Sequence, residues 1–168
     1  MTISMCQASA PRFANTLDNL TQILDKAHTH AETRKIDPLV LTGARLYPDM
    51  LPMSRQIQLA CDAAKGAVAR LAGVEVPKHE DTEQTFAELK ARIAKTLVFI
   101  GGFGPERIDG SEEKEITLKF RGNDTCFTGS QYLLGLVLPN FYFHVTTAYD
   151  ILRHNGVDIG KRDYIGTP

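Results

Sequence analysis

Two polar side chains interrupt the longest apolar-rich stretch of the chain and are the strongest candidates for chemistry. Residues 128–156 read TGSQYLLGLVLPNFYFHVTTAYDILRHNG, and Asn140 and His144 follow Pro139 within it. Residues four apart share one face of a helix, so both side chains are expected on the same side. An imidazole can serve as a general base or a metal ligand, and an amide can orient a substrate or a water. The pair therefore predicts a polar site on an otherwise apolar helix.

The spacing of apolar residues predicts that 128–156 is one long helix. Leucine, valine, isoleucine and aromatic side chains recur there every three or four residues. Thr128 with Gln131 three residues later is typical of a helix start, and such a helix would be roughly 40 Å long. Pro139 should bend it, because proline lacks an N–H and leaves the carbonyl near Gly135 unpaired.

Three further segments show the same helical period. The predicted helices cover about residues 4–34, 49 or 51 to 71, and 81–100. Pro11 either starts or kinks the first of them. Asp81 and Gln84 have the spacing of a capping box at the start of the third.

Between the third and fourth predicted helices, the period changes to that of a strand. Residues 115–121 alternate polar and apolar side chains, a turn-rich Gly-Asn-Asp follows, and residues 125–128 can return. After the fourth helix, residues 157–168 are expected to be an extended tail. The chain is therefore predicted to be one all-α domain over residues 1–168, a four-helix bundle with a small β-hairpin between helices three and four.

The composition limits the classes of function. Charged residues make up 23% of the chain and hydrophobic residues 43%, as in an ordinary globular protein. Basic and acidic residues number 19 and 20, so no basic excess suggests nucleic-acid binding. The sequence has no long apolar run and no signal-like start, which predicts a cytoplasmic protein without a membrane partner. The three cysteines have no paired spacing and are expected to be reduced.

Several other polar residues could belong to a site. Gln56 follows the core-facing Met53 and could point partly inward, whereas Asp49 could either cap the second helix or add charge to a site. Cys61 could pair with His144 as nucleophile and base, although a small thiol in an alanine-rich helix usually serves packing. His79 lies in the linker before the third helix and is expected to be exposed.

Three segments carry a resemblance to a known family. They are TISMCQASAPRFANTLDNLTQILDKA, PDMLPMSRQIQLACDAAKGAVARLAGVEVP and LPNFYFHVTTAYDILRHNGVDIGKRDY. The resemblance that they carry covers nearly the whole length of the chain, and the last segment is the most distinctive. With these segments the chain resembles the DinB/YfiT-like superfamily of four-helix bundles, and within it a bacterial branch of unknown function.

The resemblance implies a place for a metal site. Metal-binding members use one histidine from helix two and an H-x-x-x-H pair from helix four. Under the match to the Leu-Arg-x-x-Gly-Val segment, His144 takes the place of the second histidine of the pair and Asn140 that of the first. Helix two contains no histidine, which leaves Gln56, Gln58 and Asp49 as alternative partners. One imidazole with amide oxygens is a poor donor set for zinc or nickel. A divalent-metal site, a metal-free pocket and a satisfied polar pair remain as alternatives.

Two functional hypotheses follow. In the first, the bundle binds a small molecule and is related to the metal- and thiol-dependent transferases and isomerases of the superfamily. His144 is then a metal ligand or the catalytic base, Asn140 and Gln56 orient the ligand, and Asp49 adds charge. In the second, the chain is a structural or interaction protein, a homodimer whose wide apolar helix faces are covered by a second copy.

Overall fold

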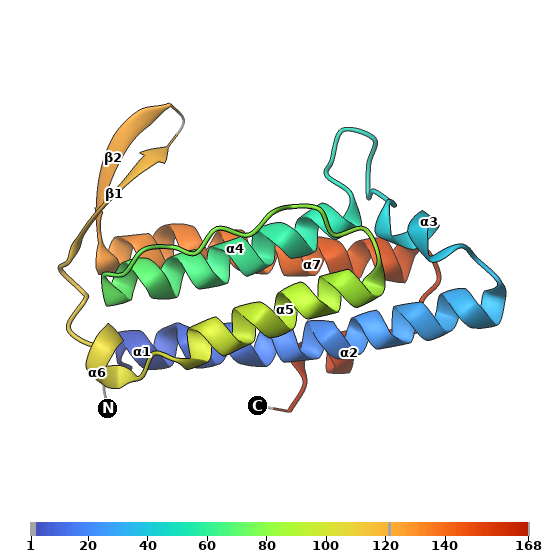
Figure 1. The fold of residues 1–168 in the computed structure, drawn as a ribbon, viewed down its shortest axis with the longest axis horizontal. Coiled ribbons are helices and arrows are strands. Elements are labelled where there is room, and N and C mark those ends of the chain that lie inside the picture. The colour runs from blue at the N-terminus through green and yellow to red at the C-terminus, as the bar shows by residue number, and fades with distance from the viewer. Residues whose placement is uncertain (1–2, 121, 168) are drawn as a thin grey trace.

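The computed structural model describes residues 3–120 and 122–167 and confirms the four-helix bundle. The predicted domain limits at residues 1 and 168 and the predicted strand end at Arg121 lie outside the described residues. Four long helices lie side by side (Figure 1): α2 (Ala10–Arg34), α4 (Met53–Ala72), α5 (Phe86–Gly101) and α7 (Leu138–His154). Among the described residues, no helix is both long and apolar enough to cross a bilayer.

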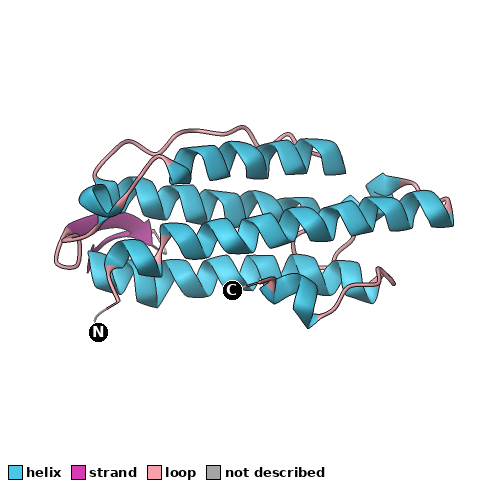
Figure 2. Ribbon diagram, turned by 90° about the horizontal axis from the view of Figure 1, so that it is seen from below, coloured by secondary structure: helices cyan, strands magenta, loops and turns pink. Residues whose placement is uncertain are grey.

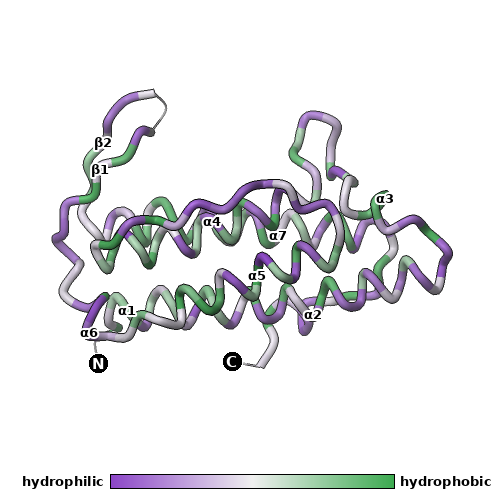
Figure 3. Tube along the Cα trace, viewed as in Figure 1, coloured by the Kyte–Doolittle hydropathy of each residue, from purple (hydrophilic) through white to green (hydrophobic). Residues whose placement is uncertain are grey.

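The order of the helices requires a long crossover. Helices α4 and α5 run in the same direction, opposite to α2 and α7, so the chain must return along the bundle between them (Figure 1). Helix α4 has 20 residues and is about 30 Å long. The connector, residues 73–85, reaches roughly 40 Å when extended, enough to span that length. Figure 3 shows it as a largely hydrophilic trace above α4.

Short helices cap the ends of the long ones. Ser9, with φ −120° and ψ −90°, separates the first turn from α2, so Pro11 lies near the start of the main helix and does not kink its interior. Residues Lys161–Ile165 form α8 against α2, which corrects the prediction of an extended tail. The short helices are α1 (Met5–Ala8), α3 (Pro38–Thr42), α6 (Pro105–Ile108) and α8 (Lys161–Ile165).

The predicted hairpin is present at one end of the bundle. Strand β1 (Glu115–Phe120) pairs antiparallel with β2 (Asn123–Thr128), from Glu115 opposite Thr128 to Phe120 opposite Asn123. Figure 2 shows the two strands beside the helix ends at the N-terminal side of the molecule. The hairpin leads directly into the helix that carries His144.

That last helix starts as the sequence predicts and becomes irregular before Pro139. The Thr128 hydroxyl accepts the Gln131 N–H at 3.3 Å, and the Gln131 side chain accepts the Thr128 N–H at 3.1 Å. Residues Gln131–Val137 form a π-helix, η1, and α7 follows with Pro139 in its first turn. The wider π turn lies where a proline cannot donate a hydrogen bond to the preceding turn. The irregularity predicted at Pro139 thus takes the form of a π-to-α transition.

The core lies between the long helices. Phe13 of α2 and Phe141 of α7 are fully buried and meet edge to face with ring centroids 4.9 Å apart. Ala60, Cys61 and Ala64 of α4 are also fully buried, and such small side chains allow neighbouring helices to approach closely. This packing fixes α4 against α7 and α5.

A buried arginine ties the connector to the bundle. Arg92 of α5 is 3% exposed, and its Nη2 lies 2.8 Å from Oδ1 of Asp62 and 2.9 Å from Oδ1 of Asp81. Its Nη1 lies 3.1 Å from Oε2 of Glu83 and donates to the Glu80 carbonyl at 3.0 Å. Asp62 belongs to α4, and the other three partners belong to the connector. One guanidinium therefore joins two helices and the crossover.

This cluster also corrects the predicted start of the third long helix. Asp81 pairs with Arg92 and Arg55 and does not cap α5. The capping box is formed by Thr85 and Glu88, whose side chains each accept the backbone N–H of the other. The capping pattern was therefore correct in type but lay four residues further along the chain.

We expect Arg92→Met to destabilise the fold by about 2–4 kcal/mol, because Asp62, Asp81 and Glu83 lose the buried cation that they share, and only Asp62 and Asp81 keep a second one, in Lys65 and Arg55. Urea unfolding followed by circular dichroism measures this change. Arg162→Met on the exposed surface of α8 is the matched control and should change stability by less than about 0.5 kcal/mol. Equal effects of the two substitutions would contradict a structural role for the cluster.

Candidate functional site

The structure brings together one pair of the predicted site residues, Gln56 of α4 and His144 of α7. The amide Oε1 of Gln56 lies 2.7 Å from Nδ1 of His144. Gln56 is 2% exposed, and its Nε2 donates to the backbone carbonyl of Leu51 at 3.1 Å. Gln56, which was one of three alternatives from the sequence, is the α4 residue that contacts the imidazole.

These contacts define the tautomer of the ring. The Leu51 carbonyl only accepts hydrogen bonds, so it fixes the NH2 group of Gln56 toward itself and the amide oxygen toward His144. The oxygen also only accepts, so Nδ1 of His144 must carry the proton. In the neutral ring, Nε2 then has a free lone pair. Within the described residues Nε2 makes no hydrogen bond, and it is not sealed from solvent.

The surroundings of His144 favour the neutral ring. Burial lowers the pKa of His144 from its ordinary value of 6.5, and the positive charge of Arg55 lowers it further. Arg55 itself pairs with Asp81 of the connector and donates to Gln58 at 3.0 Å. A half-buried imidazole that is neutral at pH 7, with one nitrogen anchored and the other accessible, has the properties of a proton acceptor.

Apolar side chains lie next to the pair. The Phe143 ring meets the His144 ring edge to face at 5.4 Å between centroids, and Phe143 is 55% exposed. Leu51, whose carbonyl holds Gln56, is 43% exposed. An exposed aromatic ring therefore lies next to the imidazole, and an exposed leucine supplies the carbonyl that holds Gln56.

Three other candidates from the sequence lie elsewhere. Asn140 is exposed near the start of α7, and the expected polar pair with His144 is replaced by the contact between His144 and Gln56. Asp49 is exposed in a turn before α4, because that helix begins at Met53 with Pro52 preceding it, and so Asp49 does not cap it. Gln58 is directed to the connector, where it donates to Oε2 of Glu83 at 3.0 Å.

The side chains present do not make the three-ligand metal site that the resemblance implies. Within residues 3–120 and 122–167, no group of three or more histidine, cysteine, aspartate or glutamate side chains is placed to hold a metal ion. At the pair itself the donors are one imidazole and one amide, and both polar atoms of the amide are engaged. This set does not match the histidine- and carboxylate-rich sites that zinc or nickel favours.

The surroundings of Cys61 do not favour the nucleophile–base pair with His144 that the sequence allowed. Its side chain is fully buried, and burial raises the pKa of the thiol to about 12, with a hydrogen bond to Thr96 acting weakly against it. A thiol with such a pKa stays protonated at neutral pH and is a poor nucleophile. The packing role expected for a cysteine in an alanine-rich helix is the one that agrees with this environment.

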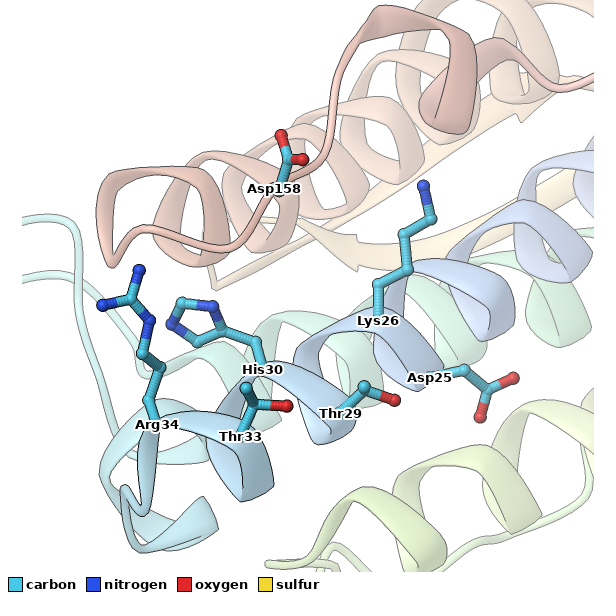
Figure 4. A pocket seen from close by; sticks show the side chains of 7 residues that line it. All are labelled: Asp25, Lys26, Thr29, His30, Thr33, Arg34 and Asp158. Atoms are coloured by element: carbon cyan, nitrogen blue, oxygen red, sulfur yellow. The ribbon is translucent and has the colours of Figure 1, made fainter.

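Away from the pair, a polar hollow lies between α2 and the segment after α7 (Figure 4). It has a volume of about 520 Å³, and His30, Arg34 and Lys26 extend toward the side of Asp158. Lys26 is already paired with Asp163 at 2.6 Å. The lining mixes opposite charges on an open surface, so its geometry does not favour one class of ligand.

We expect Gln56→Glu to raise the pKa of His144, because a carboxylate on Nδ1 stabilises the imidazolium. Gln56→Leu should lower it, because the charged ring loses a hydrogen-bond acceptor. Both changes can be measured by NMR titration of the imidazole resonances, with exposed His154 as an internal control. A His144 pKa that is the same in both variants would contradict the contact.

We also expect stability to fall as the pH drops below about 6.5, because the folded-state pKa of His144 lies below that value. In this window the unfolded chain binds protons that the folded chain does not, which favours unfolding. His144→Gln should reduce the loss of stability measured by urea unfolding at a series of pH values. His79, whose pKa is also lowered by burial, should retain part of the pH dependence in that variant.

Comparisons with known proteins agree with this fold. The family described as "Domain of unknown function (DUF1993)" matches residues 5–165. A crystal structure of a DinB family member from Shewanella denitrificans is similar, with 43% sequence identity and a TM-score of 0.90; the match covers 96% of this chain and 91% of that one. No curated protein matches the chain. The chain therefore belongs to the DUF1993 family of DinB-like four-helix bundles.

Proposed function

We propose that this chain binds a small molecule beside the pair of Gln56 and His144, with Nε2 of His144 as the proton acceptor. One observation carries the proposal: the ring is held through Nδ1 by an amide that is itself fixed, which leaves the lone pair of Nε2 accessible. The alternatives of a packed polar pair and a three-histidine metal site explain this arrangement less well. A ring kept only for packing would not need an accessible nitrogen.

The pair has the parts that proton transfer requires. A proton taken from a ligand would go to Nε2, while Nδ1–H keeps its hydrogen bond to Gln56. That bond strengthens as the ring becomes positive, whereas burial and Arg55 oppose the charge. The two effects keep the base neutral before reaction and still allow it to accept a proton.

The neighbouring side chains indicate the shape of the ligand. The exposed ring of Phe143 offers apolar contact next to the His144 ring that carries the polar Nε2. A small molecule with an apolar group next to an acidic O–H, N–H or S–H would use both features. No metal is needed in this proposal, and the donors at the pair do not suggest one.

We expect His144→Gln to abolish binding at this site and Gln56→Leu to weaken it by roughly tenfold, because the second variant keeps the base but frees the ring. The measurement is NMR screening of acidic small molecules against metal-free protein, read from the ligand's own resonances in every variant and also at the His144 ring where that ring is present. Exposed His154→Gln is the matched control and should bind as the wild type does. Ligands that bind the wild type and His144→Gln equally would argue against the site.

Metal analysis of protein purified without chelator or histidine-affinity resin provides a separate check. Near-stoichiometric zinc or nickel in the wild type that is lost in His144→Gln would mean that His144 is a metal ligand and not the metal-free base proposed above. Without such metal, the effects of the variants on ligand binding decide the question.

The second candidate function is that of a structural homodimer. Tyr47, Leu51 and Phe143 are 66%, 43% and 55% exposed, and a second copy of the chain could cover them. We expect sedimentation velocity to give a dimer that Phe143→Ser weakens in this case. A monomer at all concentrations would contradict the homodimer, and the exposed apolar side chains would then be available to a ligand.

A further inference from the structure

A polar hollow between the connector and α5 is the strongest feature outside the proposed site. It has a volume of about 470 Å³ and lies against the face of α5, whereas His144 is on α7. The residues that matter to its chemistry are Lys78, His79, Glu80, Glu83, Arg92 and Lys95. Cationic and histidine side chains thus reach the hollow from both the connector and the helix.

Two nitrogen atoms of the lining have no hydrogen-bond partner. Nε of Arg92 and Nδ1 of His79 are both sealed from solvent and unpaired within the described residues. The terminal nitrogens of Arg92 already bind carboxylates, so its Nε–H is the donor left over. A buried donor without an acceptor costs about 1–3 kcal/mol, which native structures rarely leave uncompensated. The sequence had suggested an exposed His79; the connector instead folds it partly inward.

The local charge favours an anionic acceptor. Burial and the nearby cations Lys65, Lys95 and Arg92 lower the pKa of His79, against the weaker opposite effect of Asp62. Two of the three carboxylates that line the hollow are already engaged. Glu83 binds Arg92 and Gln58, and Glu88 accepts the N–H groups of the first turn of α5.

We propose that this hollow binds a tetrahedral oxyanion, a phosphate group that is either free or part of a small ester. Nε–H of Arg92 and the ammonium of Lys95 are two donors for such an anion, and Nδ1 of His79 is a third when the ring carries its proton on that nitrogen. The rest of the hollow leaves room for the organic part of an ester. This proposal does not rest on the proposed base at His144.

An ordered water is the simplest competing occupant, because one water can accept hydrogen bonds from both unpaired nitrogens. Water and an oxyanion differ in charge. An anion next to an imidazole favours its protonated form and raises its pKa, whereas water does not. His79 therefore reports directly on the occupant.

The test is an NMR titration with sulfate, whose charge is constant over the pH range, at an ionic strength held fixed with chloride. We expect saturable shifts of the His79 ring resonances and a rise in the pKa of His79, with exposed His154 unchanged. Shifts without saturation, or equal shifts of all histidines, would overturn the proposal and leave water as the occupant.

Variants sharpen the test. Lys95→Gln should weaken sulfate binding roughly tenfold, because one charged donor is lost. Lys161→Gln, which removes the same charge from the exposed surface of α8, is the matched control and should bind as the wild type does. Glu80→Gln removes an exposed carboxylate from the rim and should tighten binding. Identical sulfate affinities of Lys95→Gln and the wild type would contradict the role of Lys95 as a donor.

Inorganic phosphate and glycerol phosphate then distinguish the two sources of the anion. Tighter binding of the ester means that the remaining volume of the hollow contacts the organic part. Equal binding means that the site recognises the free anion. Failure of both probes to shift His79 would contradict the proposal, whatever is found at His144.

Discussion

The contacts of Arg92 hold the connector between α4 and α5 against the bundle. Because α4 and α5 run in the same direction, the polypeptide must cross the length of the bundle between them, and a polar connector has little apolar surface to hold it there. Arg92 supplies the attachment by binding Asp62 of α4 together with Asp81 and Glu83 of the connector. Such a buried cluster adds little net stability compared with apolar packing, but losing one partner is costly. Its main effect is to fix where the connector lies.

The same cluster connects the two sites that we propose. Asp81 pairs with Arg55, and the charge of Arg55 helps to keep His144 neutral. On the other side, Arg92 lines the polar hollow and leaves its Nε–H unpaired there. Helix α4 thus has an amide directed to α7 at Gln56, a carboxylate paired with Arg92 of α5 at Asp62, and an amide that contacts the connector at Gln58. The position of one helix determines both environments.

Helix-level features could be predicted because they depend on neighbours in sequence. The Thr128 capping box and the hairpin arise from local hydrogen bonding and sterics, and both were confirmed. At Pro139, where a bend was predicted, the structure has a π-helix followed by an α-helix. The cap of α5 was misplaced because Asp81 is drawn into a contact with Arg92, eleven positions away, which a local pattern does not reveal. The short helix α8 was missed for a related reason, since a helix of five residues depends on packing against α2.

The amino-acid sequence alone determined the all-α bundle and its hairpin and singled out His144 as a candidate site residue, because periodicity and residue type are properties of the chain itself. Only the tertiary structure decided that Gln56, and not Asn140, Gln58 or Asp49, contacts the imidazole. Spacing along α7 places Asn140 and His144 on one side, but which side chain lies within hydrogen-bond distance depends on the rotation and packing of α4 against α7. The tertiary structure likewise decided which nitrogen of the ring carries the proton, because the Leu51 carbonyl orients the Gln56 amide that faces Nδ1.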